Sequence, residues 1–143
     1  MKKTDVKQGV LFICKHNSAR SQMAEGLLRT MYAKHFEVYS AGVEPTRVED
    51  NAIEVMREIG VDISGHRSKG LEEFQDERFD YVVTVCEEGL EGCPYFPGGG
   101  VNIHKAFEDP ASDQGSQSER LAAYRRVRDE IKTWLETAFG GKP

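Results

Sequence analysis

Four short segments with apolar and β-branched residues predict the strands of a sheet. They cover residues 10–13, 37–41, 81–85 and 101–104. The first and third runs are unbroken instead of alternating, which is typical of strands buried on both faces of a parallel sheet. We therefore predict one domain over residues 1–143, an α/β fold with a four-stranded parallel sheet flanked by helices.

The segments between and after these runs show the three-to-four-residue spacing of amphipathic helices. Ser18 or Ser21 can cap the first helix, Gly60 is placed to end the second, and the charged residues of the last helix, Arg128 among them, are expected mostly on its solvated face. Strands that alternate with helices predict a doubly wound topology with the ligand site at the carboxyl ends of the strands. The apolar stripes of the three helices are Ala24, Leu27, Leu28 and Met31, then Ile53, Met56 and Ile59, and finally Leu121, Tyr124, Val127, Ile131, Leu135 and Ala138.

A polar loop joins the first strand to the first helix. It reads Cys-Lys-His-Asn-Ser-Ala-Arg-Ser over residues 14–21, with five residues between its cysteine and its arginine. A loop of this length at a helix N-terminus can turn several backbone N–H groups toward one tetrahedral anion, and a planar guanidinium can then bind two of the anion's oxygens. We predict an oxyanion site that consists of Cys14 and Arg20 with Lys15, His16, Asn17, Ser18, Ala19 and Ser21.

Cys14 is the candidate nucleophile of this loop. The positive field of the loop favours its thiolate, to which Ser21 can donate a hydrogen bond. Asn17 tolerates left-handed dihedral angles and can hold the shape of the loop, whereas His16 faces either the anion or the solvent. The alternative is that Cys14 is only a small buried side chain at the end of a strand. A polar loop with an arginine behind the cysteine favours catalysis.

Asp109 is the candidate general acid. An oxygen leaves an oxyanion more easily when an acid protonates it, and Asp109 follows the fourth strand at the same edge of the predicted sheet. Pro110 would stiffen the turn that presents the carboxyl group. The alternative is that Asp109 and Pro110 form only a turn.

Composition narrows the class of partner. The chain has 24 acidic residues against 19 lysines and arginines, a net charge of −5, which argues against nucleic acid held by general electrostatics. No apolar run is long enough to span a bilayer, and the N-terminal run is too short for a secretory signal. We expect a cytoplasmic monomer without a membrane partner. Three cysteines without an export signal indicate thiol chemistry or metal ligation in place of a structural disulfide framework.

The resemblance to a known family extends over nearly the whole chain. Residues 11–29, Leu-Phe-Ile-Cys-Lys-His-Asn-Ser-Ala-Arg-Ser-Gln-Met-Ala-Glu-Gly-Leu-Leu-Arg, resemble the phosphate-binding loop shared by low-molecular-weight protein tyrosine phosphatases and thioredoxin-coupled arsenate reductases. Residues 39–42 and 109–110 also resemble family features. Gln22 stands where the phosphatases typically have proline, and residues 111–112 are Ala-Ser in place of the phosphatases' aromatic pair. These departures favour the reductases over the phosphatases. The spacing of Cys86 and Cys93, which is that of the reductases, favours them as well.

The resemblance implies a relay of three thiol steps. Cys14 attacks arsenate while Asp109 protonates the departing oxygen, Cys86 then attacks Cys14 and releases arsenite, and Cys93 attacks Cys86. Thioredoxin or another thiol reductant would reduce the final Cys86–Cys93 disulfide, and phosphate or sulfate would compete with arsenate. A helix over residues 86–93 would hold the two Cα atoms roughly 10 Å apart, beyond the limit of about 7 Å for a disulfide, so the segment must rearrange.

Residues beyond Cys86 provide the backbone freedom for that rearrangement. Gly89 and Gly92 lie between the two cysteines, and a glycine triplet follows at residues 98–100. A zinc site and a pair of inert thiols are the alternatives for Cys86 and Cys93. Six intervening residues exceed the two to four of a zinc knuckle, which argues against zinc. The inert-thiol alternative rests on the position of Cys86 at the end of a buried strand.

No tightly bound cofactor is expected, although some reductases of this family bind potassium beside the loop. Asn17, Glu25 and Ser40 match the positions used for that ion. Lys69 stands where an acidic ligand would be expected, and a lysine could supply the positive charge itself, which argues against potassium.

Two other functions are compatible with the same residues. A phosphomonoesterase that acts on phosphotyrosine or a small phosphate ester would use the same loop and acid, and some phosphatase activity is expected in either case. A redox-sensing, oxyanion-binding module would use the cysteines as a switch. Asp109 argues against pure sensing, which needs no acid.

Overall fold

The computed structural model describes residues 7–87 and 96–140. The predictions that concern Cys93, Gly89 and Gly92 therefore lie outside the described residues. No helix of the described segments is long and apolar enough to cross a membrane.

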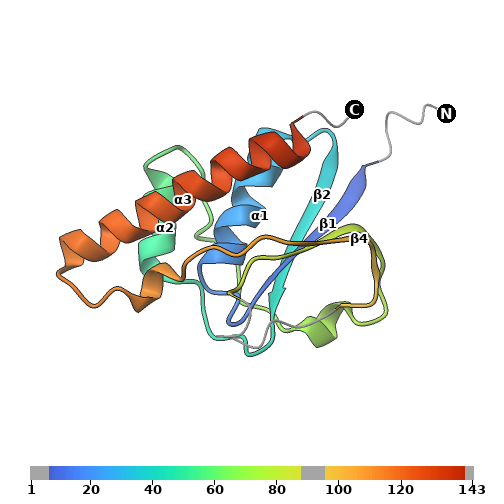
Figure 1. The fold of residues 1–143 in the computed structure, drawn as a ribbon, viewed down its shortest axis with the longest axis horizontal. Helices are drawn as coiled ribbons and strands as arrows, with labels where there is room; N and C mark the ends of the chain where they lie inside the picture. Colours follow the sequence, from blue (N-terminus) through green and yellow to red (C-terminus); the bar gives the residue numbers. More distant parts are fainter. Residues whose placement is uncertain (1–6, 88–95, 141–143) are drawn as a thin grey trace.

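A parallel sheet of four strands organises the chain (Figure 1). The three neighbouring pairs are all parallel, so the predicted sheet is confirmed. The spatial order is β2-β1-β3-β4. The bounds of the strands are β1 Gln8–Cys14, β2 Phe36–Gly42, β3 Phe79–Thr84 and β4 Gly99–His104.

Strand β1 is the most deeply buried strand because it lies between two others and is covered on both faces. Val10 and Phe12 belong to the larger core, whereas Leu11 and Ile13 belong to the smaller core on the opposite face. All four side chains are fully buried. The unbroken apolar run is thus the consequence of a strand that meets no solvent on either face.

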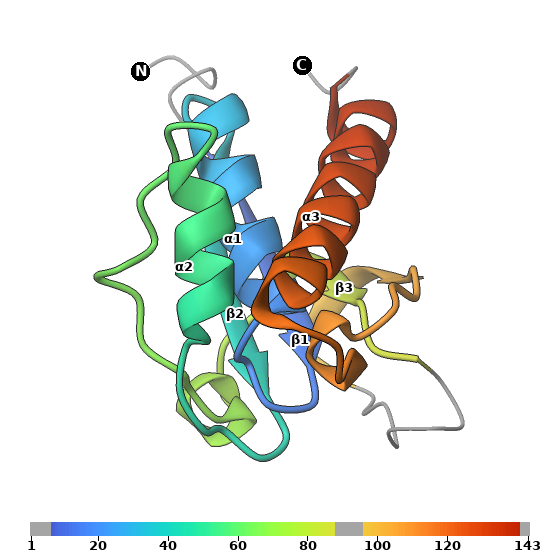
Figure 2. The ribbon, with the colours of Figure 1, turned by 90° about the vertical axis from the view of Figure 1, so that its left-hand side faces the viewer.

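Three α-helices cover one face of the sheet: α1 (Arg20–Met31), α2 (Asp50–Arg57) and α3 (Gln117–Phe139). Figures 1 and 2 show them together on one side of the strands, and side chains from all three join the larger core. The opposite face carries the short 3₁₀ helix η2 (Leu71–Phe74) and an aromatic group that comprises Tyr39, Phe74, Phe79 and Phe96. A second 3₁₀ helix, η3 (Pro110–Ser112), precedes α3.

The structure corrects several predicted details of the helices. Helix α1 begins at Arg20 without a side-chain cap, so neither Ser18 nor Ser21 caps it. Helix α2 ends at Arg57, and Ile59 lies beyond it with 40% of its surface exposed. Arg128 is buried, because its guanidinium donates to the carbonyl of Val55 and pairs with a carboxylate on the segment after α2.

The glycine triplet at residues 98–100, which was expected only to give the backbone freedom, lies partly within a strand. Gly99 and Gly100 form the start of β4, and a Cβ atom on Gly99 would lie 2.7 Å from the side chain of Val82 on the neighbouring strand. The first two residues of β4 therefore serve close packing between strands in addition to any freedom they give the backbone.

The topology brings the ends of β1 and β3 together. After β1 the next strand, β2, is added at one edge of the sheet, and after β3 the next strand, β4, is added at the other edge. The point between β1 and β3 is therefore a topological switch point, where ligand sites of parallel sheets lie. Ile13 pairs with Thr84, and the backbone N–H of Val85 donates to the carbonyl of Ile13 at 2.8 Å. Cys14 therefore ends β1, and Cys86 lies two residues beyond the end of the adjacent strand β3.

Candidate functional site

Cys14 is the last residue of β1 and has a free, buried thiol with 2% of its surface exposed. Its Sγ lies 2.9 Å from Oγ of Ser21. Ser21 Oγ accepts a hydrogen bond from Nδ2 of Asn17 at 2.8 Å. The hydroxyl hydrogen of Ser21 is therefore available for the sulfur of Cys14, which is the direction that stabilises a thiolate.

Asn17 determines the shape of the loop between Cys14 and Arg20. Its backbone is left-handed, with φ of 50°, and it is the only described residue other than glycine with a positive φ. Its Oδ1 accepts from the backbone N–H of Lys69 at 2.8 Å and from Nε2 of Gln22 at 2.9 Å. The fully buried amide thus holds an unfavourable backbone conformation from three sides.

The carbonyl groups of the loop are bonded on its outer side. Those of Lys15 and Ser18 accept from the backbone N–H groups of Glu44 and Glu49, at 2.8 and 2.9 Å. The carbonyl of His16 accepts from the hydroxyl of Ser68 at 2.8 Å.

Within the described part of the chain, the backbone N–H groups of residues 15–19 donate no hydrogen bond. They precede the N-terminus of α1, where the helix dipole adds positive potential. A left-handed residue within such a run of unbonded N–H groups produces the concave nest that binds tetrahedral anions.

His16 turns away from the loop. Its Nδ1 lies 3.0 Å from the carbonyl oxygen of Glu44, which can only accept, so the imidazole donates outward. The contact lies at an exposed position, so of the two orientations predicted for His16 it is nearer to the one toward the solvent.

Arg20 and Asp109 meet at one side of the loop. Arg20 is 3% exposed, its Nη1 donates to the carbonyl of Phe107 at 3.2 Å, and its Nη2 lies 3.6 Å from Oδ2 of Asp109. Asp109 is partly exposed and caps η3, since its Oδ1 accepts from the backbone N–H of Ala111 at 3.0 Å. One carboxylate oxygen is thus fixed by the turn, and the other faces the arginine.

Cys86 lies two residues beyond β3 and is fully buried, in the same core as Cys14. Its sulfur is disulfide-bonded, whereas Cys14 is a free thiol. The predicted role of Cys93 lies outside the described residues, and the Cys86–Cys93 pairing therefore stays a prediction.

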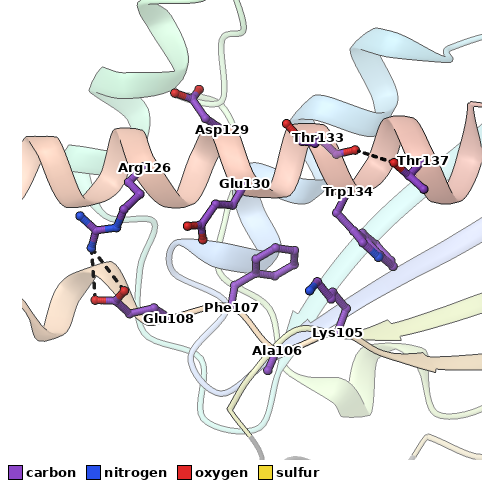
Figure 3. A pocket seen from close by; sticks show the side chains of 10 residues that line it. All are labelled: Lys105, Ala106, Phe107, Glu108, Arg126, Asp129, Glu130, Thr133, Trp134 and Thr137. Atoms are coloured by element: carbon purple, nitrogen blue, oxygen red, sulfur yellow. Dashed lines mark hydrogen bonds and ion pairs between the residues drawn. The ribbon is translucent and has the colours of Figure 1, made fainter.

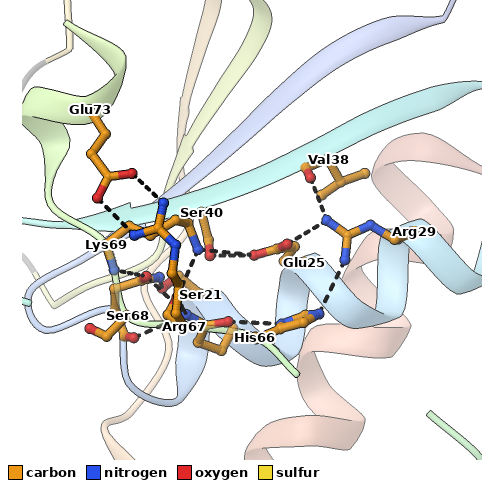
Figure 4. Close-up of polar contacts among 12 residues, drawn as sticks. Ser21, Glu25, Arg29, Val38, Ser40, His66, Arg67, Ser68, Lys69 and Glu73 are labelled. Atoms are coloured by element: carbon orange, nitrogen blue, oxygen red, sulfur yellow. Dashed lines mark hydrogen bonds and ion pairs between the residues drawn. The ribbon is translucent and has the colours of Figure 1, made fainter. Parts of the chain in front are cut away.

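A cluster of charges lies behind the loop (Figure 4). The buried carboxylate of Glu25 accepts from the hydroxyl of Ser40 and pairs with Arg29, and Nζ of Lys69 lies 3.8 Å from its Oε1. Burial lowers the pKa of Lys69, and the Glu25 carboxylate opposes that shift. The Glu25 carboxylate, which the sequence matched to a potassium ligand, is therefore surrounded by two cations and a hydroxyl donor.

These residues do not fit a potassium ion well. The Oδ1 atom of Asn17, a second matched ligand, already accepts two N–H donors. The Glu25 carboxylate has two cationic neighbours, Arg29 and Lys69, which a bound cation would have to approach at the cost of like-charge repulsion. The oxygen atoms that would bind the ion are thus engaged by donors from the chain itself.

Sequence reasoning did not assign two residues that support this site. The Nε2 atom of Gln22 donates to Asn17 and to the carbonyl of Arg67, and its Oε1 accepts from Nδ1 of His66 at 2.9 Å. His66 Nε2 accepts from Arg29 at 3.1 Å. Burial, aided by Arg29 and Lys69, lowers the pKa of His66. The partners of His66 lie far away in sequence, so no local pattern could have identified its role.

A cavity of about 790 Å³ lies beside the site, between residues 105–108 and α3. Figure 3 shows Phe107 and Trp134 facing it, with their ring centroids 6.2 Å apart. Lys105 and Glu130 also line it. Neither Cys14 nor Arg20 does, but Phe107, which lines the cavity, accepts a hydrogen bond from Arg20 through its carbonyl.

Comparison with known protein families finds a match over most of the chain. The family model for low molecular weight phosphotyrosine protein phosphatases matches residues 9–139. An arsenate reductase of Halalkalibacterium halodurans is 42% identical over 135 residues, which are 92% of this chain and 97% of that protein. An arsenate reductase of Bacillus subtilis is 40% identical over 134 residues, which are 93% and 96% of the two chains.

Solved structures give the same result. An arsenate reductase in the phosphate binding state superimposes with a TM-score of 0.77 at 37% identity, over 91% of this chain and 95% of that one. A thioredoxin-dependent arsenate reductase of Corynebacterium glutamicum gives 0.63 at 28% identity, over 92% and 61%. A low molecular weight protein tyrosine phosphatase of T. tengcongensis gives 0.70 at 26% identity, over 94% and 99%.

Proposed function

Because the chain belongs to the low molecular weight phosphotyrosine protein phosphatase family, among its arsenate reductases, we propose that it reduces arsenate to arsenite. One observation carries the proposal. A free Cys14 thiol lies at the centre of an anion-binding loop, beside an arginine and a carboxyl group, and a second, disulfide-bonded cysteine follows the adjacent strand end. A phosphatase needs the first three groups but not the fourth.

In the first step the Cys14 thiolate attacks the arsenic atom of arsenate. The N–H groups of residues 15–19 and the Arg20 guanidinium stabilise the negative oxygens. Asp109 donates its proton to the oxygen whose bond to arsenic breaks, and water leaves. The product is a covalent Cys14–arsenic(V) adduct.

The second and third steps transfer electrons between sulfur atoms. The Cys86 thiolate attacks Sγ of Cys14, the sulfur–arsenic electron pair remains on arsenic, and arsenite leaves with arsenic reduced by two electrons. Cys93 then attacks Sγ of Cys86 and Cys14 departs as a thiolate. The observed state, with Cys14 free and Cys86 in a disulfide, agrees with the state expected after the third step.

An external dithiol must reduce the last disulfide, and we propose thioredoxin for this role. The support is one structural relative described as thioredoxin-dependent. The reaction requires a compartment in which thiols stay reduced, which suggests the cytoplasm. We further propose that the protein acts as a monomer.

We propose that catalysis needs no potassium, because the Lys69 ammonium lies beside the carboxylate that would bind the ion. Equal turnover in potassium and sodium salts of the same ionic strength is expected. A stimulation specific to potassium would contradict this proposal.

A coupled assay tests the reductase. The protein is mixed with arsenate, thioredoxin, thioredoxin reductase and NADPH, and the loss of NADPH absorbance is followed for the wild type and for Cys14→Ser, Cys86→Ser and Cys93→Ser. Turnover should vanish in all three variants. A fully active Cys93→Ser would show that the third step is wrong, and an inactive wild type that hydrolyses an aryl phosphate rapidly would favour the phosphatase.

Phosphatase activity is the second candidate function, because the loop, Arg20 and Asp109 suit phosphate esters equally well. Ala111 and Ser112 follow the acid and offer no aromatic surface for a phosphotyrosine ring. We expect slow hydrolysis of aryl phosphates that requires Cys14 but neither Cys86 nor Cys93. This difference makes the phosphatase reaction an internal probe of the anion site alone.

A further inference from the structure

His104 connects the end of β4 to the cysteine that follows β3. Its Nε2 lies 2.9 Å from the backbone carbonyl oxygen of Cys86. A carbonyl can only accept, so Nε2 carries the hydrogen and donates it. Cys86 is fully buried, whereas His104 is exposed and the bond between them is partly buried, so the imidazole reaches inward from the surface to the backbone of the cysteine.

Backbone pairing between the two strands extends almost, but not quite, to Cys86. The N–H of Lys105 donates to the carbonyl of Thr84 at 2.9 Å, and the N–H of Phe107 donates to the carbonyl of Val85 at 3.1 Å. The imidazole of His104 extends this series by one residue, to Cys86 itself. The bond therefore holds the backbone of Cys86 two residues beyond the end of β3.

The same short segment also reaches the anion site. Residue 107 accepts the guanidinium of Arg20 through its carbonyl, and Asp109 is two residues further on. Residues 104–109 thus contact the relay cysteine at one end, and at the other end they contact the arginine and carry the acid. The His104 side chain that bonds to Cys86 therefore belongs to the same backbone segment that positions Arg20 and Asp109 at the anion site.

We propose that His104 is a positioning residue of the thiol relay, which holds the backbone of Cys86 so that its sulfur attacks Sγ of Cys14. The inference rests on the proposed reductase function. Cys86 must exchange sulfur partners during the relay, and a donor on its carbonyl keeps its Cα fixed relative to the sheet. Without that donor the sulfur would sample a wider range of positions and react more slowly.

Three variants test the role of His104. His104→Phe keeps a flat ring but removes the donor, and His104→Gln keeps an N–H donor on a side chain of similar reach. Asn102→Ala, on the same edge strand, is the matched control for loss of a polar side chain. Each is measured in the thioredoxin-coupled arsenate assay and in aryl phosphate hydrolysis, which uses Cys14 and Arg20 without the relay.

We expect His104→Phe to lower reductase kcat about tenfold while phosphatase kcat changes by less than about twofold, since misplacement of a reacting atom affects only the step in which that atom reacts. His104→Gln should restore most of the reductase rate, and Asn102→Ala should match the wild type. Equal losses of both activities in His104→Phe would overturn the inference in favour of a general structural role. An unaltered reductase rate would overturn it as well.

The design separates failure of this inference from failure of the proposed function. A wild type without arsenate turnover would remove the premise, whereas an active wild type with a fully active His104→Phe would remove only the inference. The rate at which dithiothreitol reduces the Cys86 disulfide adds a readout that needs no arsenate. It should rise several-fold in His104→Phe, because an unanchored disulfide is more accessible to thiolate attack.

Discussion

At the scale of single residues, the partners of each polar group determine where its hydrogen lies, and these hydrogens define the chemistry of the site. Ser21 accepts from Asn17 and so can donate to the sulfur of Cys14. One oxygen of Asp109 is held by the turn that it caps, which leaves the other for the substrate. The oxyanion site is therefore oriented before any anion arrives.

Replacement of Asp109 tests its role as the acid. Asp109→Asn should lower arsenate turnover by about 10²–10⁴-fold, the usual contribution of a general acid. Hydrolysis of p-nitrophenyl phosphate should fall much less, because its leaving group departs without a proton. Steady-state rates on the two substrates are the measurement, and equal losses would indicate that Asp109 only supports the turn. Asp113→Asn, at the other end of η3, is the matched control.

The imidazole of His66 gives the fold a defined response to acid. Its neutral form donates from Nδ1 to Gln22 and accepts at Nε2 from Arg29, and a second proton would place an N–H against that guanidinium. Since burial lowers its pKa in the folded state, the unfolded chain binds the proton more readily. The free energy of unfolding should therefore fall as pH decreases through the ordinary histidine pKa of about 6.5.

Urea unfolding at several pH values checks this expectation. His66→Gln removes the titration, so the wild type should lose more stability than the variant between about pH 7.5 and about pH 5.5. The comparison between the two proteins isolates His66 from the other histidines. Parallel pH curves would show that His66 does not contribute.

At the scale of elements, the site depends on how closely β2 approaches the loop after β1. A Cβ atom on Gly42 would lie 2.7 Å from the backbone nitrogen of Asn17 and 2.8 Å from the carbonyl oxygen of Lys15. The backbone N–H of Gly42 also donates to the carbonyl of Lys69 at 2.8 Å. The end of one strand is thus part of the support for the loop that follows another.

Gly42→Ala should displace the loop. We expect a loss of stability of about 1–3 kcal/mol from overpacking and a decrease in both arsenate and aryl phosphate turnover. Gly65→Ala is a suitable control, since no atom lies within 4 Å of a Cβ placed there. Thermal unfolding and the two assays measure the effect. Wild-type activity in Gly42→Ala would mean that the loop has room to adjust.

The same elements show what the sequence can and cannot predict. Strand β1 and the loop of residues 14–21 were predictable because an unbroken apolar run and a fixed Cys-to-Arg spacing are local patterns. Helix ends and supporting contacts were not, because they depend on partners far along the chain. Asn17 is bonded to residue 69, and the buried guanidinium of Arg128 is bonded to Val55 on another helix. Residue types alone do not reveal such pairs.

At the scale of the whole molecule, the order of the strands brings the chemistry together. Cys14 and Cys86 are distant in sequence, but β1 and β3 are neighbours and end at the same edge of the sheet. The helices cover one face, and residues 104–109 return along this edge with Asp109. A nucleophile and an arginine from one loop, a second cysteine after β3 and an acid after β4 thus come from three separate segments, each placed by the parallel sheet.

The contact between Trp134 and Phe107 gives the molecule an optical reporter of its own anion site. Trp134 is the single tryptophan of the chain, and its ring packs against the residue whose carbonyl accepts from Arg20. An anion that engages the guanidinium will disturb that carbonyl and with it the surroundings of the indole. Titration with phosphate should therefore change the intrinsic fluorescence of the wild type but not that of Arg20→Met. Occupancy of the site could then be followed in real time, without a label and without turnover.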